Sequence, residues 1–170
     1  EKDLANARLI EPVMESVGWG GFTSTELEKK LTGKQVALSS GLSYYSESLS
    51  GSSTPKDLRT LFELIYLRFQ RPMNDADAYR TVINAIRTGL ENADKNPQKA
   101  FGDSVRTTLY GNNPRKAQLT LADLKQANYE TIKQLYAQRF NKGGDFDFYF
   151  TGAVNVDSLR AFTEQYIATL

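Results

Sequence analysis

The chain has 170 residues, of which 40% are hydrophobic and 24% charged, as expected for one globular domain large enough to bury a core. Its net charge of +1, with both signs interspersed, gives no electrostatic reason to expect nucleic acid or an anionic membrane as a partner. Cysteine and histidine are both absent, which excludes disulfides, thiolate nucleophiles and imidazole ligands or bases.

The N-terminal part predicts two helices separated by a glycine-rich loop. Residues 3–17 carry apolar side chains at spacings of three and four, with Pro12 expected to kink or split the helix. The loop at residues 18–21 contains the single tryptophan, Trp19. A short second helix follows, with Ser24 or Thr25 as its N-cap and Gly33 at its C-terminal end.

Residues 34–55 predict a β-hairpin, and the helices on either side are expected to cover it. Polar and apolar residues alternate over 34–39 and 42–50, which is typical of half-buried strands. We expect the turn at Ser40-Gly41 and a bulge near Tyr45-Ser46.

Helices dominate the chain from residue 54 to residue 140. Thr54, followed by Pro55 and Asp57, has the pattern of a helix N-terminus, and Thr120 with Asp123 repeats it. Further apolar stripes predict helices over residues 58–69, 75–90, 97–109 and 129–140. In the helix that begins at Pro97, the apolar residues are spaced by four: Phe101, Val105 and Leu109.

Residues 145–151 give the strongest strand signal, because Phe146, Phe148 and Phe150 alternate with polar residues. A final amphipathic helix follows, capped near Asn155. The fold class is therefore α+β: an antiparallel sheet covered by several helices. So many helices against three predicted strands indicate that the first strands lie upstream of Glu1. We expect residues 1–170 to form one domain, truncated on its N-terminal side, without membrane insertion because no apolar run is long enough.

Several residues are candidates for a functional role. Asp145 and Asp147 lie about 7 Å apart on one strand face, where a cation site competes with the more frequent solvated sheet face. An aromatic binding surface formed by Trp19, Tyr44 and Tyr45 competes with core and loop packing. Tyr110 and Arg115 flank a turn that either contacts a partner or simply ends a helix. These five aromatic and arginine residues are the candidate substrate or interdomain contacts, and no catalytic, cofactor or metal residue is assigned.

Four segments together resemble the pitrilysin-type zinc metallopeptidases, and specifically a non-catalytic repeat in the C-terminal half of long bacterial members. The segments are GGFTSTEL at 20–27, LTGK at 31–34, LSGSSTPKDL at 49–58 and LYGNNP at 109–114. The tail from Arg139 to Tyr166 is similar to that family's last strand and helix. The order and spacing of these pieces cover nearly the whole chain.

The resemblance also implies which chemistry is missing. Catalytic repeats carry the motif His-x-x-Glu-His on an early helix, which corresponds here to RLIEPVM at residues 8–14. Glu11 and Glu15 do not replace two imidazoles in a zinc site. Asn113 occupies a position that is commonly histidine in catalytic repeats.

By the resemblance, the chain is expected to be a non-catalytic domain that forms part of a peptide-enclosing chamber, with zinc in another domain of the same polypeptide. Its partners would then be those other domains and a peptide substrate, in the periplasm or cell envelope. The alternative is an interaction or scaffold domain of a non-peptidase homologue. A hydrolase within this chain itself is disfavoured by the missing histidine and cysteine.

Overall fold

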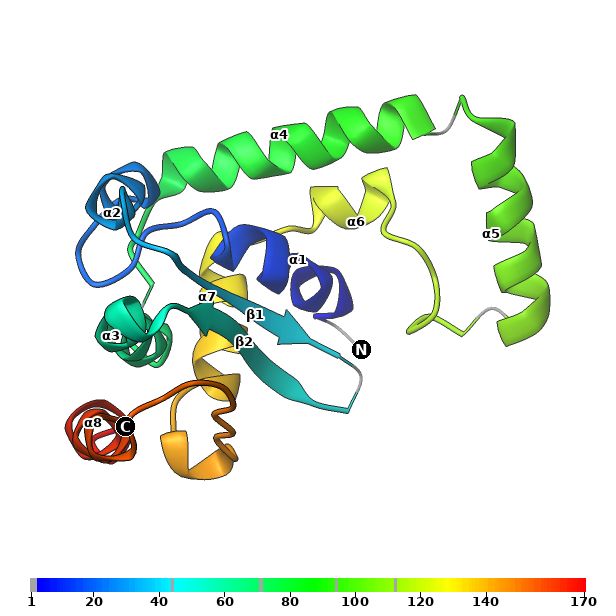
Figure 1. Cartoon of the computed structure of the whole chain (residues 1–170). Helices are drawn as coiled ribbons and strands as arrows, with labels where there is room; N and C mark the ends of the chain where they lie inside the picture. Colours follow the sequence, from blue (N-terminus) through cyan, green and yellow to red (C-terminus); the bar gives the residue numbers. More distant parts are fainter. Residues whose placement is uncertain (1–2, 44, 71, 94, 112) are drawn as a thin grey trace.

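A computed structural model describes residues 3–43, 45–70, 72–93, 95–111 and 113–170. The described elements are one β-hairpin and a surrounding set of helices (Figure 1). The helices are α1 (Leu4–Met14), α2 (Ser24–Leu31), α3 (Leu58–Arg68), α4 (Ala76–Ala93), α5 (Pro97–Tyr110), α6 (Leu121–Lys125), α7 (Tyr129–Arg139) and α8 (Val156–Phe162). Short 3-10 segments, η1 (Pro55–Asp57) and η2 (Gly143–Asp145), and a π-helical turn, η3 (Thr163–Ile167), complete them. Within these ranges no helix has the length and apolarity that a membrane crossing requires.

The hairpin is formed by β1 (Val36–Leu42) and β2 (Glu47–Ser53), paired antiparallel from Val36 opposite Ser53 to Leu42 opposite Glu47. The register is continuous, so no bulge interrupts it. Ser40 and Gly41 lie inside β1 and not in the predicted turn. The ladder instead closes at Leu42 and Glu47, and beyond it the Ser43 hydroxyl accepts hydrogen bonds from the main-chain nitrogens of Tyr45 and Ser46.

Helix ends occur close to where the capping residues predicted them. The Thr54 hydroxyl accepts a hydrogen bond from the Asp57 nitrogen, and Thr120 forms a reciprocal capping box with Asp123. Asn155 caps α8 as expected. The N-cap of α2 is Thr23, one residue before the predicted candidates, because Glu26 bonds back to its main-chain nitrogen.

Two hydrophobic clusters form the core. The first joins α1 to α7 and adds residues from α4 and α6; its fully buried members include Leu9, Val13, Met14, Ile132 and Tyr136. The second surrounds α3, where Phe62 is fully buried beneath the inner face of the hairpin. Leu49 of β2 contacts both clusters, so the hairpin links them.

The segment predicted as a third strand, residues 145–151, has the expected side-chain arrangement but forms no ladder. Phe146, Phe148 and Phe150 pack on the core clusters, and Tyr149 between them is 84% exposed. Phe150 stacks on Phe62 with ring centroids 4.9 Å apart. In the described part of the chain only β1 and β2 form a sheet, so the strand prediction is wrong there. The three phenylalanines that motivated the prediction do face the core and are partly buried against it.

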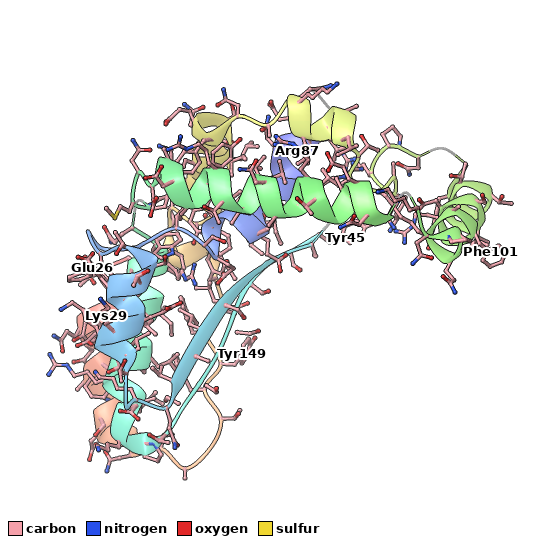
Figure 2. All side chains as sticks on the ribbon, turned by 90° about the horizontal axis from the view of Figure 1, so that it is seen from above. Glu26, Lys29, Tyr45, Arg87, Phe101 and Tyr149 are labelled. Carbon is pink, nitrogen blue, oxygen red and sulfur yellow. The ribbon has the colours of Figure 1, made fainter. Side chains whose placement is uncertain are left out.

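α4 and α5 extend away from the hairpin. α4 runs along one side of the molecule, and α5 stands at its far end, well separated from α3 and α8 in both views (Figures 1 and 2). Gly111 ends α5 in the left-handed conformation, with φ of 58°, so the chain turns back toward α6.

Candidate functional site

The helix that corresponds to the zinc-binding helix of the resembled family is α1, and Glu15, the residue at its C-terminal end, has other partners. The Glu15 carboxylate accepts hydrogen bonds from the Ser40 main-chain nitrogen at 2.9 Å and from the Ser40 hydroxyl at 2.6 Å. Its second oxygen accepts from the Arg68 guanidinium at 2.9 Å. Glu11 is exposed on the same helix. Because both oxygens of Glu15 are hydrogen-bonded to Ser40 and Arg68, this carboxylate is not available as a metal ligand.

Zinc does not fit the residues that this chain supplies. The sequence has neither histidine nor cysteine, and no group of three acidic side chains converges within the ranges described. Asp145 and Asp147 are exposed side chains, one in η2 and one in the extended segment that follows it.

Trp19 lies in the core. Its side chain is 3% exposed, and its indole N–H donates to the Met14 carbonyl at 3.3 Å. The Tyr136 ring is 5.2 Å away and the Arg68 guanidinium lies 4.8 Å above the indole. The main chain of Trp19 also forms isolated bridges with Phe22 and Pro72. These contacts anchor the loop between α1 and α2.

Tyr45 and Arg115 line one groove, although 70 positions separate them in the sequence. We call it the turn groove: a hollow of about 400 Å³ between the hairpin turn, the start of α1, the loop after α5 and α7. Tyr45 is 99% exposed at its rim. Across the groove, Arg139 forms an ion pair with Glu47 at 2.7 Å. Tyr44, the remaining aromatic candidate of the hairpin, falls outside the described residues.

Tyr110 lines a second hollow, the α5 cavity, of about 490 Å³ between α5 and residues 113–122. Lys99 and Asp103 of α5 form an ion pair at 2.9 Å in its wall, and the Lys116 ammonium lies 5.3 Å from the Tyr110 ring centre. This wall is polar. The sequence placed Tyr110 and Arg115 together around one turn, whereas the structure assigns them to neighbouring hollows.

The opposite side of α5 is apolar and exposed. Phe101, Val105 and Leu109 form the stripe, with exposed fractions of 72%, 40% and 71%. Figure 2 places Phe101 at the far end of the molecule, away from the hairpin. The spacing of four predicted the helix but not whether its apolar stripe is buried. The structure leaves this stripe on the surface, where such patches usually mark an interaction site.

The outer face of the hairpin is flat and polar. It presents small residues in opposite pairs, Ala37 with Ser52, Ser39 with Ser50 and Gly41 with Ser48. Tyr149 projects from the neighbouring extended segment on the side away from α3 (Figure 2). The sequence alternation predicted this exposure, but not that the face lacks large side chains along both strands.

The pKa shifts of Tyr136, Tyr129 and Asp57 reflect structural roles. Burial raises the pKa of Tyr136 well above its usual range, and its hydroxyl donates to the Arg68 carbonyl at 2.8 Å. Burial also raises the pKa of Tyr129. Hydrogen bonds from the Gln35 nitrogen and the Thr54 hydroxyl lower the pKa of Asp57, which ties β1 to η1.

Comparison with solved structures supplies the fold relationship. The chain superposes with a TM-score of 0.80 on the crystal structure of the periplasmic protease PqqL from Escherichia coli, at 23% identity, covering 99% of this chain and 19% of that one. It also matches the ferredoxin protease FusC, solved as a mutant in complex with Arabidopsis ferredoxin, with a TM-score of 0.72 and 18% identity, covering 96% of this chain and 18% of that one. No protein-family model and no curated protein matches the sequence.

The expected fold is therefore confirmed: this chain is an α+β unit shaped like part of these proteases, and it spans less than a fifth of the length of either. At these identities the likeness establishes the fold alone.

Proposed function

We propose that this chain is a non-catalytic domain of a larger zinc metallopeptidase and that it forms part of the wall of a peptide-enclosing chamber. One observation carries the proposal: the chain shares its fold, over 99% of its length, with 19% of a protease chain, while its own sequence lacks histidine and cysteine. The chemistry would then belong to another domain of the same polypeptide, which would hold the zinc.

The surfaces of the domain support a wall better than a selective binding site. The outer face of the hairpin carries small, mostly serine side chains, which would allow peptides of different sequence to lie against it. The turn groove offers Tyr45 and Arg115 at one end of this hairpin. We assign these two residues to substrate or interdomain contact, and Tyr110 to the adjoining surface. Because one matched neighbour is a periplasmic protease, we also propose the periplasm as the compartment.

A second candidate is an interaction domain of a homologue without peptidase activity. The observation that favours it is the exposed apolar stripe of Phe101, Val105 and Leu109, which suits stable contact with another protein domain. The two candidates differ in one feature outside this chain. A His-x-x-Glu-His motif elsewhere in the complete gene product supports the peptidase, and its absence supports the interaction domain.

The test measures zinc content and peptide hydrolysis for two proteins, the 170-residue chain and the complete gene product. We expect the short chain to contain no stoichiometric zinc and to hydrolyse no unstructured peptide. The complete product should bind zinc and lose its activity with a chelator. Hydrolysis by the short chain, or a complete product without peptidase activity, would refute the proposal. The second result would leave the interaction domain as the better account.

A further inference from the structure

The two edges of the hairpin differ in whether other parts of the chain form hydrogen bonds to them. At the outer edge of β1, the Ser40 nitrogen donates to Glu15 and the Leu38 carbonyl accepts from Arg68 at 3.5 Å. Glu15 and Arg68 are themselves ion-paired. Side chains at the C-terminal ends of α1 and α3 therefore occupy two hydrogen-bonding groups in the middle of this edge. Covering an edge in this way is one of the means by which proteins prevent further strand pairing.

The edge of β2 has no such cover among the described residues. Two main-chain hydrogen bonds flank the ladder: the Thr54 nitrogen donates to the Gln35 carbonyl at 3.2 Å, and the Ser43 nitrogen donates to the Ser46 carbonyl at 2.9 Å. They determine which residues of each strand point their main-chain groups toward the partner strand. Alternate residues of β2 consequently bond to β1, namely Ser48, Ser50 and Ser52. The main-chain groups of Leu49, Gly51 and Ser53 point the other way. Nothing in the described part of the chain bonds to them across this edge.

An extended segment lies beyond this edge with its own main chain unpaired. Residues 147–151 alternate between packed phenylalanines and exposed polar side chains, as a strand does, yet none of the described residues forms a ladder with them. Phe150 is held in place by stacking on Phe62. The segment thus has the side-chain pattern of a sheet strand but lacks a neighbour.

A hollow separates the two unpaired edges. We call it the strand slot, and it has a volume of about 390 Å³. One side is formed by the end of β2, from Gly51, and by Thr54 and Pro55. The other side is formed by Tyr149–Val154, the end of the extended segment and the residues that follow it. Two almost fully buried side chains of α3, Leu58 and Leu61, line its floor. Gly51 faces this floor, where a Cβ atom would lie 2.8 Å from a Leu61 methyl carbon.

We propose that the strand slot accepts an extended segment of the same polypeptide from outside residues 1–170, hydrogen-bonded to β2 and carrying apolar side chains at alternate positions toward Leu58 and Leu61. Main-chain groups along its sides and an apolar floor are what an added strand requires. A tethered segment fits better than an exchanging peptide, because the slot reaches into the core of the domain and this chain covers less than a fifth of the matched protease chains. The inference rests on the proposed function only in placing this chain within a longer polypeptide.

The experiment compares hydrogen–deuterium exchange of residues 47–53 in the 170-residue chain and in the complete gene product, resolved to single amides by fragmentation mass spectrometry. In the short chain, the amides of Leu49, Gly51 and Ser53 should exchange at least about 100-fold faster than those of Ser48, Ser50 and Ser52, which are bonded to β1. In the complete product, the first three should slow by a similar factor. Equal exchange of Leu49, Gly51 and Ser53 in the two proteins would overturn the proposal, as would a gene product that consists of these 170 residues alone.

A pair of proline variants provides a second readout. Ser53→Pro removes an amide that points into the strand slot, whereas Ser52→Pro removes one that bonds to β1. Ser52→Pro should lower the unfolding temperature of both proteins, and Ser53→Pro should lower it more in the complete product than in the short chain. An equal effect of Ser53→Pro in the two proteins contradicts the proposal. None of these measurements depends on peptidase activity. Amide protection in a complete product that does not hydrolyse peptides would therefore support the strand-slot proposal and contradict only the proposed function.

Discussion

Glu15 accepts two hydrogen bonds from Ser40, 25 positions later in the sequence, and so fixes α1 to the edge of β1. Replacing Glu15 by alanine leaves the N–H of buried Ser40 without its partner and removes the ion pair of Arg68, whose side chain is only 11% exposed. We expect Glu15→Ala to lower the free energy of unfolding by about 2–3 kcal/mol, as measured by urea denaturation. The matched control is Glu11→Ala, one turn earlier and exposed, which should cost less than about 0.5 kcal/mol. Similar losses for the two variants would contradict the role assigned to Glu15.

Tyr136 should make the protein sensitive to alkali. Its pKa is raised in the folded state, so the stabilisation is complete below the unfolded-state value of about 10 and decreases as the pH rises above it. Tyr136→Phe should cost about 1 kcal/mol at neutral pH through loss of the bond to the Arg68 carbonyl. The variant should also lose less stability than the wild type as the pH is raised from about 9 to about 11. Parallel stability curves for both proteins would argue against a contribution from this hydroxyl.

Asp57 should have the opposite effect at acid pH. Its pKa is lowered by hydrogen bonds from Gln35 and Thr54, so its stabilisation is present above the unfolded-state value of about 3.9 and is lost as the pH falls through the folded-state value. Asp57→Asn should therefore be less stable than the wild type at about pH 6, with the difference shrinking below about pH 4. Thermal unfolding followed by circular dichroism measures both. A difference that stays constant down to about pH 2 would exclude this carboxylate as the source.

Two glycines should respond in opposite directions to alanine. Gly89 lies on the exposed side of α4, where an added Cβ atom would have no neighbour within 4 Å, so Gly89→Ala should stabilise the protein by about 0.5–1 kcal/mol. At Gly18 a Cβ atom would lie 1.8 Å from the Phe22 carbonyl oxygen. Gly18→Ala should destabilise it by about 3 kcal/mol or more, because main chain and not a flexible side chain must move. Chemical denaturation of both variants checks the pair, and a tolerated Gly18→Ala would disprove the close approach.

The apolar stripe of α5 should contribute little to the stability of the 170-residue chain. Phe101→Ala combined with Leu109→Ala removes two largely exposed side chains, and we expect the free energy of unfolding to change by less than about 0.5 kcal/mol. Binding of the dye ANS should fall. Phe62→Ala, a fully buried control, should cost about 3–5 kcal/mol. A large loss from the α5 double variant would mean that the stripe is packed within this chain.

Local signals in the sequence predicted the helices well, because their causes lie within a few residues. Thr54, Thr120 and Asn155 cap helices through neighbours three positions away, so the pattern contains the whole interaction. The hairpin turn was misplaced because Ser40 is held in β1 by Glu15, a contact that no local pattern encodes. The third strand was predicted from Phe146, Phe148 and Phe150, but strand pairing needs a second segment.

The candidate contact residues likewise divide into what local sequence predicts and what depends on distant parts of the chain. Tyr45 and Arg115 were identified by residue type, and their shared groove depends on how α5 leads the chain back toward the hairpin turn. Their role in binding remains a prediction. Trp19 had two competing interpretations, a binding surface or core packing, and its 3% exposure places it among the packed side chains.

The position of that tryptophan provides a built-in optical probe. As the only indole in the sequence, held between Arg68 and Tyr136 at the junction of the loop with the first core cluster, it alone determines the indole fluorescence of the domain. Its emission should shift to longer wavelength when water reaches this junction. The opening of one defined region can therefore be timed by stopped-flow mixing without attaching a label.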